Sequence, residues 1–147
     1  MADFLKQLQS GRPLILDGAT GTELAARGFP LAGPGWSAAA IVEAPELLIE
    51  IHRDYVRAGA GIITANTFRT QRRSLAPAGW DGRAAEFTAR AVELARLAAE
   101  SDTLIAGSLS PLADCYSPQL TPNASALAEE HAEHAVHLAR AGVDVLL

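Results

Sequence analysis

Residues 13–24 read Pro-Leu-Ile-Leu-Asp-Gly-Ala-Thr-Gly-Thr-Glu-Leu, and this stretch decides the fold. Its apolar run, Leu14–Leu16, is short enough to be a buried strand. The run stops at Asp17 and gives way to a turn of small residues, which leaves a carboxylate and several backbone amides at the strand end. Ligands bind at the carboxyl ends of strands in parallel α/β proteins. The stretch therefore predicts a pocket for a polar ligand.

Similar apolar runs rich in Leu, Ile and Val recur along the chain. The four runs are Leu14–Leu16, Gly61–Thr64, Thr103–Ala106 and Val143–Leu147. Each is unbroken rather than alternating, which is typical of strands in a parallel sheet whose two faces are both covered by helices. We therefore predict four parallel strands.

Stretches with helical periodicity separate these runs. The first spans Pro45 to Gly59, because proline suits the first helical position and glycine suits the end. The second runs from about Arg83 to Ala99, and the third begins near Asn123 or Ser125, either of which can cap it, and ends at Gly142. Spacings of three and four place one set of residues on one face of each of the first two helices: Leu48, Ile51, Tyr55 and Ala58, then Phe87, Ala91, Leu94 and Ala98.

The predicted order is therefore β, α, β, α, β, α, β, which places the chain in the α/β class. A faint repeat supports it, since residues 57–63 (Arg-Ala-Gly-Ala-Gly-Ile-Ile) resemble residues 140–146 (Arg-Ala-Gly-Val-Asp-Val-Leu). Right-handed crossovers would set the strands side by side and parallel. A (β/α)8 barrel needs eight strands and typically ~250 residues, so four strands do not close one.

Composition limits the classes of function. The chain has 147 residues, 49% of them hydrophobic, which suits one globular domain. Its formal net charge of -5 and 12 Lys plus Arg offer no basic stripe for a nucleic acid. No apolar run approaches the ~20 residues that span a bilayer, and the first residues lack the pattern of a secretory signal. We expect a cytoplasmic protein with no nucleic-acid or membrane partner.

Polar residues follow each predicted strand and would meet at one edge of the sheet. A pocket built from them can hold an ammonium group on Asp17 and a carboxylate on the N–H of Gly18 and on Thr67, as an amino acid requires, with Asn66 beside them. The pocket shows no evident nucleophile or general base. The alternatives are that Asp17 caps the following turn or helix, and that Asn66 and Thr67 merely end a strand. The Gly-x-x-Gly spacing of residues 18–21 does not match a dinucleotide or phosphate-binding fingerprint.

Three histidines invite a metal hypothesis but do not support one. His131, His134 and His137 follow one another at spacings of three in one helix, so they fan out around it by about 60° per step and cannot meet at one ion. Ala128, Ala132, Ala135 and Ala139 predict the buried face, which leaves His134 and His137 toward solvent. The single cysteine, Cys115, is interpreted as a plain loop residue, and one cysteine builds no disulfide framework or cysteine-rich metal cage.

Several of these motifs together resemble the homocysteine S-methyltransferase family. They are Asp17–Leu24, Trp36-Ser37, the helix with His52 and Tyr55 leading to Ala58-Gly59, Thr64–Phe68 and Gly107–Pro111. Their order and spacing agree along essentially the whole chain. The resemblance implies a (β/α)8 barrel that binds homocysteine and transfers a methyl group to its sulfur, giving methionine. It also implies that Asp17, Gly18 and Thr67, with Asn66 beside them, contact the substrate.

The resemblance further implies a zinc ion held by three cysteines. Zinc coordination supplies a thiolate nucleophile at neutral pH, although a free thiol has a pKa near ~8.5. The family's cysteine positions lie beyond Leu147, and Cys115 matches none of them. We therefore expect residues 1–147 to be the N-terminal part of the barrel domain, ending at about the fourth strand and inactive alone.

Other interpretations remain open. A free-standing half-barrel would act as a binding or structural module, and its unpaired sheet edges favour self-association or pairing with a complementing C-terminal half. A flavodoxin-like sheet would need Thr20 and Thr22 to hold a phosphate. The methyl donor stays undetermined among S-methylmethionine, S-adenosylmethionine, betaine and methylcobalamin.

Overall fold

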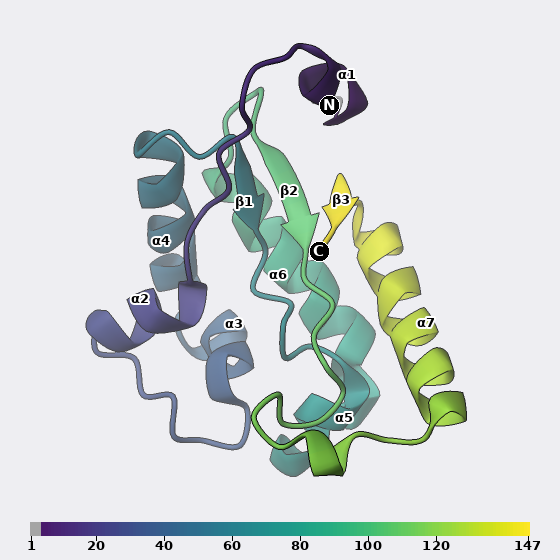
Figure 1. Ribbon diagram of the computed structural model, residues 1–147. Coiled ribbons are helices and arrows are strands. Elements are labelled where there is room, and N and C mark those ends of the chain that lie inside the picture. Colours follow the sequence, from purple (N-terminus) through teal and green to yellow (C-terminus); the bar gives the residue numbers. More distant parts are fainter. Residues whose placement is uncertain (1–3) are drawn as a thin grey trace.

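Three parallel strands lie in chain order at the centre of the computed structural model, which describes residues 4–147 (Figure 1). Ile62, Ile63 and Thr64 of the first strand pair with Leu104, Ile105 and Ala106 of the second. The second strand pairs through Ala106 and Gly107 with Val145 and Leu146 of the third. The predicted α/β class with parallel strands is therefore confirmed.

The elements follow one another as α1 (Phe4–Gln9), α2 (Thr20–Ala26), η1 (Trp36–Ala39), α3 (Ala40–Glu43), α4 (Pro45–Arg57), β1 (Ile62–Thr64), α5 (Arg72–Leu75), η2 (Ala76–Ala78), η3 (Asp81–Arg83), α6 (Ala84–Ala98), β2 (Leu104–Gly107), η4 (Pro118–Leu120), α7 (Ala124–Ala141) and β3 (Val145–Leu146). The elements labelled η are short 3₁₀ turns. The three long helices match the predicted ones to within a few residues at each end. The short helices α1, α2, α3 and α5 were not predicted.

The first predicted strand, Leu14–Leu16, is not a strand in the structure. Only Leu16 pairs with β1, through an isolated parallel bridge to Ile62. The Ile15 carbonyl accepts from the N–H groups of Gly61 and Ile62, at 2.9 and 3.1 Å. The ladder extends no further, because the Ala60 N–H donates to the Tyr55 carbonyl at 3.0 Å and the Thr64 N–H donates to the Asp17 side chain at 2.7 Å. The segment's side-by-side, parallel placement next to β1 is as predicted.

Helices α4 and α6 bury the faces that their periodicity predicts. Leu48 and Ile51 of α4 and all four named positions of α6 are buried, whereas Ala58 lies past the end of α4 and is exposed. One core cluster joins these helices to α2 and α3. A second joins α6 to the sheet through Val92, Ala95, Ile63 and Ile105. In Figure 1, α6 lies behind the strands, and α4 and α7 lie on either side of them.

Helix α7 packs through a different face from the one predicted. His134 and Leu138 are its buried residues, whereas Ala128, Ala132 and Ala139 are exposed. A Cβ built on Gly107 of β2 would lie 2.8 Å from a Leu138 methyl group, so the leucine packs directly against the sheet. The prediction for His134 was wrong because the larger apolar surface of Leu138 outweighs a stripe of alanines, and His134, four residues earlier, shares its face. The expected cap and end are confirmed at Asn123 and Gly142.

His52 is a fully buried histidine on α4. Neither of its ring nitrogens finds a hydrogen-bond partner within residues 4–147. Burial lowers the pKa of His52 from 6.5 to about 4, because a charged ring would lose its hydration there. The pKa of His134 is also lowered to about 4, mainly by burial and further by His137 and His131. Both rings are therefore neutral in the folded protein at neutral pH.

None of the helices among residues 4–147 has both the length and the apolar character needed to cross a membrane.

Replacing Leu138 tests which face of α7 is buried. Leu138→Ala is expected to lower the free energy of unfolding by about 2–5 kcal/mol, since it leaves a cavity against β2. The matched variant Val136→Ala, at a side chain that is 45% exposed, should change it by about 0.5 kcal/mol or less. Urea unfolding measures both, and equal effects would contradict this packing.

Acid titration tests the buried histidines. Their folded-state pKa values of about 4 lie below the unfolded value of 6.5, so their stabilising effect is complete above pH 6.5 and is lost as the pH falls toward 4. His52→Leu removes one of the two groups and should flatten the decline of the unfolding free energy across this window. Urea unfolding at a series of pH values measures the slope, and an unchanged slope would show that His52 does not contribute.

Candidate functional site

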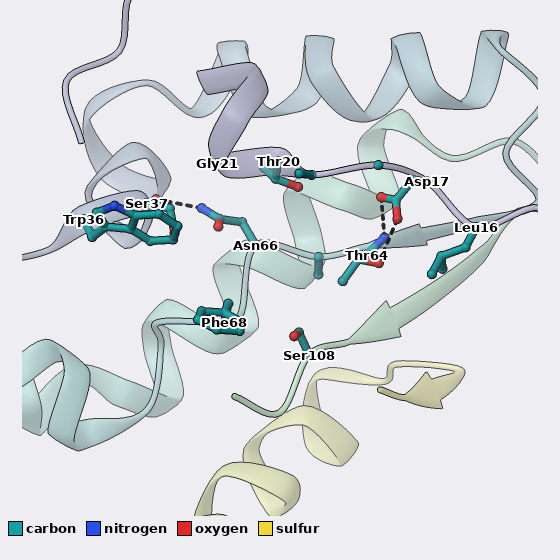
Figure 2. A pocket seen from close by; sticks show the side chains of 13 residues that line it. Leu16, Asp17, Thr20, Gly21, Trp36, Ser37, Thr64, Asn66, Phe68 and Ser108 are labelled. Carbon is teal, nitrogen blue, oxygen red and sulfur yellow. Dashed lines mark hydrogen bonds between the residues drawn. The ribbon is translucent and has the colours of Figure 1, made fainter. Parts of the chain in front are cut away.

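A cavity of about 310 Å³ lies where the edge segment and the first two strands end. Its lining residues come from the turn after Leu16, from η1 and from the loops after β1 and β2: Leu16–Gly21, Trp36, Ser37, Thr64–Asn66, Phe68 and Ser108. Figure 2 shows Asp17 and Thr64 at one end of this cavity and Trp36 and Phe68 at the other. The predicted convergence of polar residues at the carboxyl edge is therefore present for Asp17, Gly18, Thr20, Thr64, Asn66 and Ser108.

Asp17 is fixed by Thr64 of the neighbouring strand. One carboxylate oxygen accepts from the Thr64 N–H at 2.7 Å and the other from the Thr64 hydroxyl at 2.8 Å (Figure 2). Its side chain does not cap α2, whose N-terminus has no side-chain cap. Burial raises the pKa of Asp17, and the bonds from Thr64 act in the lowering direction. No cation pairs with this carboxylate among residues 4–147.

Gly18 is required by the close approach of a tyrosine. A Cβ built on Gly18 would lie 2.7 Å from the Tyr55 hydroxyl oxygen and 2.9 Å from ring atom Cε1. Tyr55 comes from α4, so this contact sets the distance between that helix and the turn. The Gly18 N–H has no acceptor among residues 4–147 and is available to a ligand.

Asn66 joins the loop after β1 to η1. Its side chain is 5% exposed, and its amide nitrogen donates to the Ser37 carbonyl at 2.7 Å (Figure 2). This bond holds the segment that carries Trp36 over the cavity. Ser37 and Phe68 also line the cavity; both belong to motifs that carry the family resemblance, but neither was predicted as a site residue. Phe68 follows an identified polar pair, and only the fold brings its ring to 6.5 Å from that of Trp36.

Thr67 is fully buried and does not line the cavity. Its hydroxyl accepts from the Ser108 N–H at 2.9 Å and lies 3.3 Å from the Ser108 carbonyl. The side chain therefore joins the loops after β1 and β2 and sets the position of Ser108, which does line the cavity. Ser110 is likewise buried, with its hydroxyl donating to the Phe68 carbonyl at 2.5 Å.

The described residues do not fit a zinc site. Across residues 4–147, no three His, Cys, Asp or Glu side chains are grouped as metal ligands. Cys115 is exposed in the loop before η4. His134 instead lies 3.2 Å from the Thr70 hydroxyl through Nε2. No chemical step through zinc can be derived from these residues.

Parallel β/α units with a carboxylate-lined cavity at the strand ends are typical of the α/β class, in which ligands bind at that edge of the sheet. The chain belongs to the homocysteine S-methyltransferase family, which it matches over residues 14–147.

Individual relatives agree with this assignment. Homocysteine S-methyltransferase of Escherichia coli is 41% identical over 108 residues, covering 67% of this chain and 35% of the relative. Betaine–homocysteine S-methyltransferase 1 of Bos taurus is 35% identical over 114 residues, covering 73% of this chain and 27% of the relative. The crystal structure of the homocysteine methyltransferase MmuM from Escherichia coli, metallated form, superposes with a TM-score of 0.84 at 35% identity, over 97% of this chain and 55% of that one. The chain thus spans about half or less of these relatives.

Substituting Gly18 tests the contact with Tyr55. Gly18→Ala is expected to cost about 1–3 kcal/mol of unfolding free energy, because the added methyl overlaps the tyrosine ring. Gly33→Ala is the matched control, since a Cβ at Gly33 meets nothing within 4 Å. Urea unfolding measures both variants, and a Gly18→Ala protein as stable as the control would contradict the contact.

Proposed function

We propose that this chain carries the homocysteine-binding part of an S-methyltransferase that moves a methyl group to the homocysteine sulfur, giving methionine. The observation that carries the proposal is Asp17, an oriented and partly buried carboxylate that lines the cavity without a cation. A buried carboxylate is costly unless it is paired, so the site favours a ligand with a positive group. Family membership and the relatives' names support homocysteine as that ligand.

The ammonium group of homocysteine is assigned to Asp17. Thr64 occupies one direction on each carboxylate oxygen, and the remaining lone pairs accept from the ligand. The bond is charge-assisted and partly shielded from water, which makes it stronger than a surface ion pair.

The carboxylate of homocysteine is assigned to the free N–H of Gly18, and Asn66 is proposed to complete the site from the facing loop. Thr67 contributes through Ser108, whose position its hydroxyl fixes. These residues bind and orient the substrate. Activation of the thiol is assigned to none of them, and the zinc that the family resemblance implies would need ligands other than the residues described.

We also propose that residues 1–147 form the first β/α units of a barrel domain. The superposition over 97% of this chain and 55% of the Escherichia coli structure supports this. Ile15, Leu16, Leu146 and Leu147 are 43–55% exposed at the two edges of the sheet. Such edges favour pairing with a complementing C-terminal half or with another copy. A binding module without catalysis is the alternative that these edges also support.

Asp17→Asn tests the proposed ammonium site. The amide retains an acceptor for the Thr64 N–H but lacks the charge, so homocysteine affinity is expected to fall by about ten- to hundredfold, the loss of about 1.5–3 kcal/mol. Isothermal titration with homocysteine measures the affinity of both proteins. Equal affinities would remove Asp17 from the site.

Unfolding of the same variant provides the control. The folded-state pKa of Asp17 is raised above 3.8, so the ionised carboxylate becomes a stability cost as the pH rises through that range. Asp17→Asn should therefore be at least as stable as the parent at neutral pH, and a large loss of stability would mean that weaker binding reflects unfolding.

A further inference from the structure

A second cavity of about 430 Å³ adjoins the first at Trp36. Its lining comes from the turn before η1, the segment around α5 and the loop after β2, and includes Trp36, Arg69, Arg73 and Asp114. Trp36 is the residue common to the two linings. The indole therefore forms a wall between them, and the polar content of the second cavity has no role in the site described above.

Arg69 is a cation without a hydrogen-bonded anion. Its guanidinium carbon lies 5.5 Å from the ring centroid of Trp36 and 5.4 Å from that of Phe68. Its Nε is buried and has no hydrogen-bond partner, and within residues 4–147 the side chain makes no ion pair or hydrogen bond. Two aromatic faces thus hold the guanidinium in place while its five donors stay unused.

The neighbouring charges do not satisfy Arg69. The pKa of Asp114 is lowered mainly by hydrogen bonds from its own loop. The charge of Arg69 also lowers it, but by less. Those bonds come from the Tyr116 N–H at 3.1 Å and the Ser117 hydroxyl at 2.8 Å. Arg73 forms an ion pair with Glu130 on α7. Arg69 is therefore the arginine of this lining that is free for a ligand.

The wall between the cavities is held in a costly conformation. Trp36 has φ 45, in the left-handed region that bulky residues avoid. A Cβ built on Gly21 would meet the indole at 3.0 Å, so the ring is closely packed on the side of the first cavity. Strain of this kind, about 1–3 kcal/mol, persists only where the surrounding structure fixes the residue, and such residues cluster at ligand sites.

We propose that the second cavity is a carboxylate-binding subsite in which Arg69 receives the carboxylate of a small organic acid. The planar guanidinium fork matches a carboxylate through two parallel hydrogen bonds. The acid is a second small molecule beside homocysteine, whose ammonium the proposed function, on which this point rests, puts at Asp17, at the opposite end of the first cavity (Figure 2). The carboxylate of homocysteine itself is the other source of the same chemistry.

Trimethylglycine and its amide are the probes, because the amide keeps the trimethylammonium group and lacks the anion. The 147-residue chain labelled at its two tryptophans reports binding by NMR: the Trp36 indole lies beneath Arg69, and the Trp80 indole, stacked on Phe87, is the comparison. We expect trimethylglycine to shift Trp36 and to bind at least tenfold more tightly than the amide. Arg69→Gln should remove this preference, and Arg69→Lys should retain part of it.

Arg83→Gln is the matched control, since Arg83 also stacks on an aromatic ring, at 5.0 Å from the Phe87 centroid, outside both cavities. Its trimethylglycine affinity should equal that of the parent. Equal affinities for acid and amide, or an Arg69-independent preference, would overturn the proposal. So would the absence of any Trp36 shift with both trimethylglycine and homocysteine.

Homocysteine titrations distinguish the sources. An affinity for homocysteine that falls in Arg69→Gln, without trimethylglycine binding, supports the subsite and assigns it to the substrate's own carboxylate. Arg69-dependent trimethylglycine binding with unchanged homocysteine affinity assigns it to a second molecule. If homocysteine fails to bind while the Arg69-dependent preference persists, the proposed function fails and the subsite stands.

Discussion

The pair of hydrogen bonds between Asp17 and Thr64 is the constraint on which the site depends. The edge segment contributes one bridge to the sheet, so its backbone alone holds it weakly. The Asp17 carboxylate adds two bonds to β1, at 2.7 and 2.8 Å, at the point where the segment turns away toward α2. These bonds place Gly18 against Tyr55 and fix the direction of the carboxylate. The same side chain thus closes the fold at this edge and presents the charge that a ligand would meet.

The Asp17 carboxylate carries a free-energy cost, because its charge is partly buried without a cation. Burial raises the pKa of Asp17, which means that the surroundings resist its charge, and the described residues supply no cation to offset the cost. Arg69 presents the opposite case across the Trp36 wall, with a guanidinium held by aromatic rings and no anion. One unpaired negative and one unpaired positive group, in adjoining cavities, are an arrangement suited to zwitterionic small molecules.

The arrangement of the sheet is consistent with the family to which the chain belongs. Strands in chain order, each preceded by a helix on one side, are the units of which α/β barrels are built. The other side of the sheet buries Ile62, Leu104 and Ala106, with Phe4, Leu14 and Val145 packed on them. The exposed apolar residues at both edges are the surface that further units or a second copy would cover.

The sequence by itself determined the parallel β/α plan, the three long helices and the convergence of Asp17, Gly18 and Asn66 on one edge. These follow from local periodicity, from capping residues such as Asn123 and from the rule that strand ends share an edge. Only the tertiary structure decided the rest. It buried His134 instead of the alanine face, since Leu138 fits against Gly107. It turned Thr67 away from the cavity, because its hydroxyl is bonded to Ser108. It also stacked Arg69 on Trp36 and Phe68. Each of these outcomes depends on side chains from separate elements meeting in space, and no spacing along one element encodes which partner a side chain will find.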